Sequence, residues 1–385
     1  MFYALIILFV CTALAYLSAN KQYSGVDNSS KAMSQRVIDL SSVAFFALLI
    51  ILVCFGGLRT FMNDTATYRD AFENKIPGSL SGINSIDWTL GSNPLFSLYQ
   101  IVLKTVVSSN GQVFIFISSL IVISSMIMFI RKYAENFGFS IFLFISFTVY
   151  AFTLAAMKQT MATALAVWAI PLSLNGKRFR AVILILITMF IHPYVVVYFA
   201  LFFLSKNVWD KRSVIIIVIT LATGFVFTSF VAQAINLISL IGDEYDSSWF
   251  NGNGVNIIRV LVYWMTPVLS FIFRRQIREQ NNQILNVCVN LSLVSACFML
   301  LASFGGAIML GRLAQYFDIL TCVALPMIIS CGFNKSMEKT IVLFIVVIGF
   351  LFFYYTYYSK YYPSFSEDMF RDYYQHVSIM ELFKG

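Results

Sequence analysis

The chain has 385 residues, of which 59% are hydrophobic and only 11% are charged, and its mean hydropathy is +0.80. A soluble domain of this length would aggregate with so much apolar surface, so the composition excludes that class. It is typical of a polytopic membrane protein and predicts an all-α helical bundle that forms a single membrane domain over residues 1–385. The six cysteines lie within or at the ends of apolar segments without any CxxC spacing, which favours packing residues over disulfides or metal ligands.

Apolar segments alternate with short basic loops along the chain. We expect the following segments to cross the membrane: 1–19, 40–57, 112–130, 139–156, 160–174, 213–234, 257–273, 283–303, 313–331 and 340–358. Positive residues favour the cytoplasmic side, and the loops that would lie there hold 16 of the 26 Lys and Arg residues. The net charge of +8 is therefore an orientation signal, with both termini outside, and does not indicate a nucleic-acid partner.

The segment 181–204 needs a different topology. A single crossing there would reverse the side of every later loop and would place the arginines at 274–278 outside. A re-entrant hairpin bent at His192-Pro193 keeps the charge pattern, because the residue before a proline is pushed away from helical geometry. We therefore predict about ten full crossings plus this hairpin.

Three outer regions complete the predicted architecture. Residues 58–111 form a long outer loop with an interfacial helix over 94–108, which would rise only about 22 Å and is too short to cross the bilayer. Residues 235–256 form an acidic outer loop, whose acids, amides and tryptophan suit carbohydrate but are equally typical of a solvated loop. The tail at 359–385 has a capping box and apolar spacing that predict an amphipathic helix on the outer surface.

The stretch GLRTFMNDTATYRDAF at 57–72 places Arg59, Asp64, Tyr68 and Arg69 directly after an apolar segment. Asp64 and Tyr68 are one helical turn apart, so both could face the same cavity. The alternative is a capped interfacial helix, in which Asp64 is the N-cap and Arg69 pairs with Glu73.

Two other turns on the predicted outer side carry cations and amides. Lys158 and Gln159 lie between two spans, and GRLAQYF at 311–317 places Arg312, Gln315 and Tyr316 on a single helical face. Cations at this interface suit the phosphate or pyrophosphate of a lipid-linked substrate. The alternative for Arg312 is that its side chain reaches to the lipid headgroups.

Two titratable residues within the apolar segments have open interpretations. Asp318, about 9 Å further along the predicted helix, is a functional candidate because a carboxylate within the membrane is costly. Its alternative is a structural ion pair with Lys158 or Arg259. His192 either stabilises the helix break through a local hydrogen bond or takes part in catalysis.

The missing motifs narrow the chemistry. The sequence contains no Walker A motif, GxGxxG, GxSxG or HExxH, which excludes the usual forms of nucleotide hydrolysis, dinucleotide redox and zinc hydrolysis. An enzyme acting at the outer face would instead need a lipid-activated donor. Because cations can take up the charge of its leaving group, we expect neither a metal nor a cofactor.

In order along the chain, these motifs resemble the EpsG-type branch of the Wzy polymerases, which assemble bacterial exopolysaccharide, capsule or O-antigen. The resemblance covers roughly residues 40–330 and rests on GLRTFMNDTATYRDAF, the Lys158-Gln159 turn, FIHPYVVV at 190–197 and GRLAQYF. The family prefers Arg where this chain has Lys158. A lysine there acts as a point charge and not as a planar phosphate clamp.

The resemblance implies a GT-C-like glycosyltransferase in the bacterial cytoplasmic membrane that uses no nucleotide sugar. Its donor would be the growing glycan on undecaprenyl pyrophosphate, its acceptor a newly flipped repeat unit, and its partners a chain-length regulator and a flippase of the same pathway. From the residues we assign pyrophosphate binding to Arg312, Arg59 and Lys158, and help to the acceptor hydroxyl to Asp64 or His192. The other candidate substrate-binding residues are Gln159, Tyr68, Arg69, Gln315, Tyr316, Asp318 and Arg259.

Two rival functions remain open at this point. A flippase for the same lipid-linked sugars also uses broken helices and polar groups within the membrane, although transporters usually have repeated halves and this sequence has no visible repeat. An O-antigen ligase would share the lipid donor and the outer polar residues.

Overall fold

The computed structural model describes residues 2–19, 40–60, 62–204, 207–226, 254–305, 307–361 and 378–383. Within these ranges every regular element is helical, which confirms the predicted all-α class. In chain order the elements are α1 (Phe2–Ala19), α2 (Leu40–Gly57), α3 (Thr65–Asn74), η1 (Leu80–Ser85), η2 (Leu90–Ser92), α4 (Pro94–Val106), α5 (Gly111–Tyr133), α6 (Phe137–Ser146), α7 (Val149–Ala155), α8 (Met157–Ala166), α9 (Ala169–Leu174), α10 (Arg178–Met189), η3 (Pro193–Phe199), α11 (Ala200–Phe203), α12 (Lys211–Phe225), α14 (Ile257–Ile272), α15 (Arg274–Gln280), α16 (Gln283–Leu301), α17 (Ala307–Gln315), α18 (Asp318–Gly332), α19 (Lys335–Tyr361) and η5 (Ile379–Phe383).

The chain is a multi-pass membrane protein. Four helices are long and apolar enough to cross a bilayer, namely α2, α5, α16 and the part of α19 up to Thr356. Three bent pairs, α6 with α7, α14 with α15, and α17 with α18, add up to three more spans among the described residues. The described residues thus hold four to seven candidate spans, and the count of ten full crossings stays a prediction.

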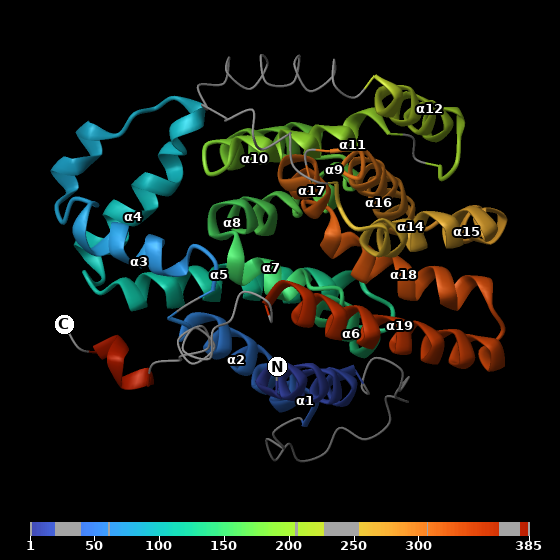
Figure 1. Ribbon diagram of the computed structural model, residues 1–385, viewed down its shortest axis with the longest axis horizontal. Helices are drawn as coiled ribbons and strands as arrows, with labels where there is room; N and C mark the ends of the chain where they lie inside the picture. The colour runs from blue at the N-terminus through green and yellow to red at the C-terminus, as the bar shows by residue number, and fades with distance from the viewer. Residues whose placement is uncertain are drawn as a thin grey trace, which may run out of the picture.

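The bundle has distinct ends. Figure 1 shows α3 and α4 together at one end, on the left, and α15 at the opposite end. Between them α2 packs on α5, α5 on α8, and α8 on α10. Every residue of α6 is buried, in line with a sequence that is apolar all round, so this helix belongs to the core of the bundle.

The segment from Arg178 to Leu204 folds back on itself, as the sequence predicted. His192 separates α10 from η3 and has an extended backbone, with φ −156° and ψ 114°. Arg178 at the start of the segment and Leu204 at its end line the same cavity. A straight crossing would place these two residues on opposite sides of the bundle, so the geometry is that of a hairpin.

Three predicted spans contain breaks that the sequence analysis did not anticipate. The span 139–156 is bent by 52° between α6 and α7, and the span 313–331 is bent by 53° between α17 and α18. The span 160–174 is divided between α8 and α9. At the first of these breaks Thr148 has a positive φ of 63°, which an α-helix does not allow.

Aromatic packing accounts for the break between α17 and α18. Tyr316 and Phe317 are both fully buried, and their ring centroids lie 6.5 and 5.1 Å from that of Tyr198. Consecutive residues of a straight helix point about 100° apart, so the break allows both rings to pack on one tyrosine. Asp318 therefore begins a new helix, and the distance expected along one continuous helix from Arg312 is wrong.

Most of the acidic loop 235–256 and most of the tail 359–385 lie outside the described residues. A helix is present where the interfacial helix was predicted: α4 begins at Pro94 as predicted and ends at Val106.

Candidate active site

The connection between α2 and α3 contains two residues with positive φ, Met62 (φ 133°) and Asn63 (φ 48°). Such conformations are uncommon outside glycine, and they persist where surrounding contacts hold them. The Asn63 side-chain amide donates a hydrogen bond to the carbonyl of Ala155, at 3.2 Å. This contact holds the start of α3 against the end of α7, three residues before Lys158.

Lys158 lies between two aromatic rings from the α3–α4 end of the bundle. Its Nζ atom is 6.0 Å from the ring centroid of Tyr68 on α3 and 5.5 Å from that of Phe96 on α4. The two rings are themselves in edge-to-face contact, with centroids 6.0 Å apart. Aromatic faces attract a cation, so α3, α4 and α8 meet around this ammonium group.

Arg312 on α17 belongs to the same group of residues. Its main-chain carbonyl accepts a hydrogen bond of 2.7 Å from the side-chain amide of Gln159. Its charge acts on both Tyr68 and His192. Gln159 is buried, with 3% of its surface exposed, so this hydrogen bond holds the main chain of Arg312 from inside the bundle. Gln315, one turn further along, is half-buried.

Tyr68 is a neutral hydrogen-bond donor at this site. Burial raises its pKa to about 12, the nearby Asp64 carboxylate adds to this shift, and Arg312 opposes it. The phenol therefore stays protonated at neutral pH. Asp64 occupies the N-cap position of α3, but its side chain makes no capping hydrogen bond, and the residue is exposed beside Tyr68.

His192 is held at the tip of the hairpin. Its Nδ1 atom shares a hydrogen bond with the hydroxyl of Tyr316, and the hydroxyl of Tyr198 donates to the Tyr316 carbonyl at 2.9 Å. Tyr316 is fully buried, so it supports His192 from inside the bundle. Because Nδ1 is engaged, Nε2 is the ring nitrogen left for a substrate. The carbonyl of Phe190, also at the tip, accepts a hydrogen bond of 3.0 Å from the Leu95 amide of α4.

Arg59 lies in a different environment from Lys158 and Arg312. It is 4% exposed, and its guanidinium donates to the Gly56 carbonyl, to the Ser119 hydroxyl at 2.8 Å and to the Thr65 hydroxyl at 3.1 Å. Its own carbonyl accepts a hydrogen bond from Gln112 at 3.0 Å. These contacts connect α2, α3 and α5, so the Arg59 side chain helps to hold these three helices together.

Arg69 packs at the contact between α3 and α5. A Cβ atom on Gly111 would lie only 2.4 Å from Cγ of Arg69, so the arginine stem needs a glycine at this position. Glu73 accepts a hydrogen bond of 2.9 Å from the Gly111 amide. Both members of the predicted Arg69 and Glu73 pair thus meet the start of α5.

Asp318 and Arg259 are connected through Tyr263. The Tyr263 hydroxyl donates to Oδ2 of Asp318 at 2.8 Å and also forms a hydrogen bond with Arg259. Of the two partners predicted for Asp318, these contacts favour Arg259. Tyr263 and Asp318 also line a small cavity of about 20 Å³ between α6–α7 and α18.

The sequence analysis missed three aromatic residues. Tyr263 lies four residues after Arg259 on one helical face, a spacing that could have revealed it. Phe96 follows the cap of α4 and Tyr198 follows the hairpin bend, but their neighbours Lys158 and Tyr316 are distant in sequence. Only the tertiary packing brings these pairs together.

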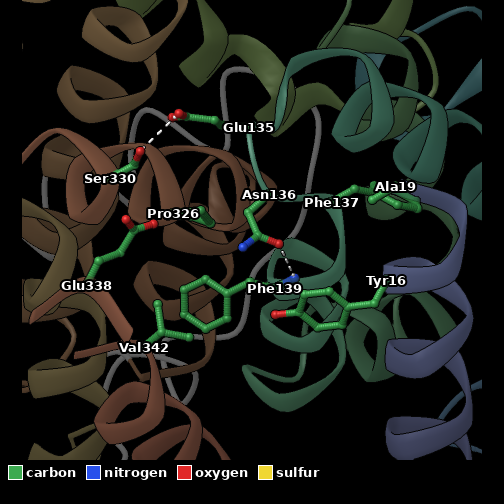
Figure 2. Close-up of a pocket in the computed structure, with 10 residues that line it drawn as sticks. All are labelled: Tyr16, Ala19, Glu135, Asn136, Phe137, Phe139, Pro326, Ser330, Glu338 and Val342. Atoms are coloured by element: carbon green, nitrogen blue, oxygen red, sulfur yellow. Dashed lines mark hydrogen bonds between the residues drawn. The ribbon is translucent and has the colours of Figure 1, made fainter. Parts of the chain in front are cut away.

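A second cavity, of about 260 Å³, contains carboxylates and is shown in Figure 2. Glu135 and Glu338 line it, and the Ser330 hydroxyl donates to Glu135 at 3.0 Å. Both glutamates belong to loops predicted to be cytoplasmic. Two carboxylates repel a phosphate, so this cavity does not suit an anionic substrate.

The candidate active site therefore has two cations, a histidine and a tyrosine, supplied by α8, α17, the hairpin tip and α3. These features define an integral membrane protein with a potential anion-binding site at the ends of its helices. The chain belongs to the EpsG family, whose family model matches residues 42–370. It is accordingly a membrane protein of polysaccharide biosynthesis. No curated protein and no solved structure matches the chain.

Proposed function

We propose that this protein is a polysaccharide polymerase of the bacterial cytoplasmic membrane. It joins undecaprenyl-pyrophosphate-linked repeat units at the outer face of the membrane. The observation that supports this most directly is that Lys158 and Arg312, which are far apart in sequence, both act on Tyr68 and on His192. Family membership supports the same pathway.

The reaction transfers a glycan from pyrophosphate to a sugar hydroxyl. The acceptor oxygen attacks the anomeric carbon, the bond from that carbon to the pyrophosphate oxygen breaks, and the bonding electrons leave with the pyrophosphate. Lys158 and Arg312 stabilise the charge that develops there, an effect that typically contributes about 10²- to 10³-fold in rate for each donor. The acceptor proton passes to Asp64 or to Nε2 of His192.

We assign supporting roles to several residues that the sequence placed in the substrate site. Gln159 and Tyr316 hold Arg312 and His192 from within the bundle, and Arg59 holds three helices together. Asp318 and Arg259 stabilise the start of α18 through Tyr263.

The proposal is tested with the purified chain in proteoliposomes that contain the lipid-linked repeat unit of its own organism. A polymerase converts this single substrate into longer lipid-linked glycans and releases undecaprenyl pyrophosphate. Arg312→Ala should stop the lengthening, whereas Arg275→Ala, at an exposed arginine of α15, should not. Movement of the unit across the bilayer without lengthening would contradict the proposal.

Movement of the repeat unit across the bilayer without lengthening is the result expected of the second candidate function, a flippase. The three bent helix pairs favour it to some degree, because discontinuous helices are common in transporters. The proteoliposome experiment separates the two functions, since a flippase changes the location of the repeat unit and not its length.

A further inference from the structure

A third cavity, of about 340 Å³, lies where the hairpin begins and ends. We call it the corner cavity. It is formed by the end of α9, the starts of α10 and α16, and the end of α11. Both polar and apolar side chains line the cavity, among them Ser173, Arg178, Gln283, Leu201, Phe202 and Leu204.

The polar side of the corner cavity carries an excess of positive charge. Arg178 lines the cavity, and Lys177 and Arg180 beside it are exposed. The first turn of α10 contains no acid, although a helix start already carries partial positive charge and normally favours one. Arg212 adds a further cation, because its guanidinium donates to the Phe203 carbonyl at 2.8 Å.

Asp210, the acid next to Lys211 and Arg212, is engaged at the start of α12. The Asp210 carboxylate caps α12 by accepting hydrogen bonds from the amides of Arg212 and Ser213. Arg178 in the wall of the cavity, together with Lys177, Arg180 and Arg212 on the adjoining segments, therefore predicts an anionic ligand.

Exposed apolar side chains flank the same cavity. Phe179 is 78% exposed and Phe203 is 74% exposed. Ile183, Leu186 and Ile187 are also exposed and recur at the spacing that puts them on the same face of α10 as Phe179. These residues form an apolar stripe that runs along α10 from its basic N-terminal end. An exposed apolar stripe of this kind suits contact with lipid acyl chains.

We propose that the corner cavity binds an anionic phospholipid of the inner leaflet. Its phosphate lies against Arg178 and its neighbouring cations, and its acyl chains lie along the exposed stripe of α10. Basic pockets between helices at the cytoplasmic side are suited to anionic headgroups. The orientation predicted from the loop charges places both ends of the hairpin on that side. This proposal is independent of glycosyl transfer.

Native mass spectrometry of the full-length protein tests the proposal. The protein is titrated with phosphatidylglycerol and, in separate experiments, with phosphatidylcholine, inorganic phosphate and undecaprenyl phosphate. We expect phosphatidylglycerol to bind more tightly than phosphatidylcholine. A basic side chain near an anionic lipid contributes roughly fivefold in affinity, so Arg178→Gln should weaken binding by about that factor.

The matched control is Arg275→Gln, which removes one exposed arginine from the same predicted side. It should leave binding unchanged. If Arg178→Gln fails to fold, Arg180→Gln serves in its place, because Arg180 is exposed and lies in the same basic first turn of α10. Equal weakening by the control and the test variant would overturn the proposal. So would binding of inorganic phosphate as tight as that of phosphatidylglycerol, or a clear preference for undecaprenyl phosphate.

Discussion

Arg312 and Lys158 supply the positive charge of the candidate active site with different geometry. Lysine carries a point charge, whereas the planar guanidinium of arginine can form two parallel hydrogen bonds to a phosphate. The hydrogen bond from Gln159 fixes the main chain of Arg312, so the arginine side chain extends from a defined backbone position. Shape as well as charge should therefore matter at position 312.

We expect Arg312→Ala to abolish polymer formation at normal protein level, a loss of at least about 10²-fold. Arg312→Lys should recover little of this loss, because lysine restores the charge but not the planar pair of donors. Polymer length on gels and the amount of protein in membranes measure the two effects. Full activity of Arg312→Lys would mean that charge alone suffices.

Arg59 should behave differently from Arg312. Arg59→Met leaves the Gly56 carbonyl and the hydroxyls of Ser119 and Thr65 without their shared donor in the core. Leaving a buried polar group without its hydrogen-bond partner typically costs about 1–3 kcal/mol, so we expect a lower melting temperature and less protein in membranes. Arg312→Met is the comparison and should melt like the wild type. An Arg59→Met protein that is stable but inactive would place Arg59 in the substrate site after all.

The hydrogen bond between His192 and Tyr316 favours a positioning role for the histidine. Glutamine can also bond to the Tyr316 hydroxyl, so His192→Gln should keep at least about a tenth of the activity, whereas loss of an essential general base costs about 10²- to 10⁴-fold. Tyr316→Phe removes the same bond from the other side and should produce a similar, partial loss. A complete loss in a folded His192→Gln protein, with Tyr316→Phe nearly normal, would identify His192 as the base.

At the scale of elements, the sequence predicted the helices whose ends carry local signals. The expected bounds of α2 agree with the structure, and α4 begins at its asparagine and proline as predicted. The hairpin followed from loop charges and His192-Pro193, both of which are visible in the sequence. The break between α17 and α18 was missed, because the packing of Tyr316 and Phe317 on Tyr198 joins residues more than a hundred positions apart.

The hairpin makes a prediction about sidedness. Cysteines introduced at the exposed residues Lys177 and Lys211, before and after the hairpin, should both resist an impermeant thiol reagent in intact cells. A cysteine in place of the exposed Asp87 in the outer loop should react. The wild-type chain measures the background from its own cysteines. Reaction at only one of positions 177 and 211 would show that the segment crosses the membrane.

At the scale of the whole molecule, the sequence indicated the cations and the histidine of the candidate site. It did not indicate which residues face the substrate and which support the site. Gln159 and Tyr316 looked like ligand-binding residues because they neighbour Arg312 and Lys158. In the structure both residues are buried and form hydrogen bonds with Arg312 and His192, from which we infer that they hold these residues in place. Burial depends on the whole bundle, and a one-dimensional pattern does not contain it.

The two ends of the molecule also differ in charge and chemistry. The candidate active site and the α3–α4 segment lie together, whereas the acidic cavity of Figure 2 and the corner cavity are lined by residues from loops predicted to be cytoplasmic. If catalysis takes place at the α3–α4 end, and that end is outside, the enzyme acts only after a repeat unit has crossed the membrane.

Deletion of the gene should therefore leave single repeat units on the outer side, attached to their lipid or passed singly to the final acceptor, with long chains missing. A flippase deletion would instead trap the units on the inner leaflet, and a ligase deletion would leave long chains on the lipid. Glycan length and accessibility to an added glycosidase in intact cells distinguish the three patterns. The wild-type gene should restore long chains, whereas the Arg312→Ala gene, expressed at the same level, should not. Trapped inner units or lipid-linked long chains would replace the polymerase proposal by the corresponding rival.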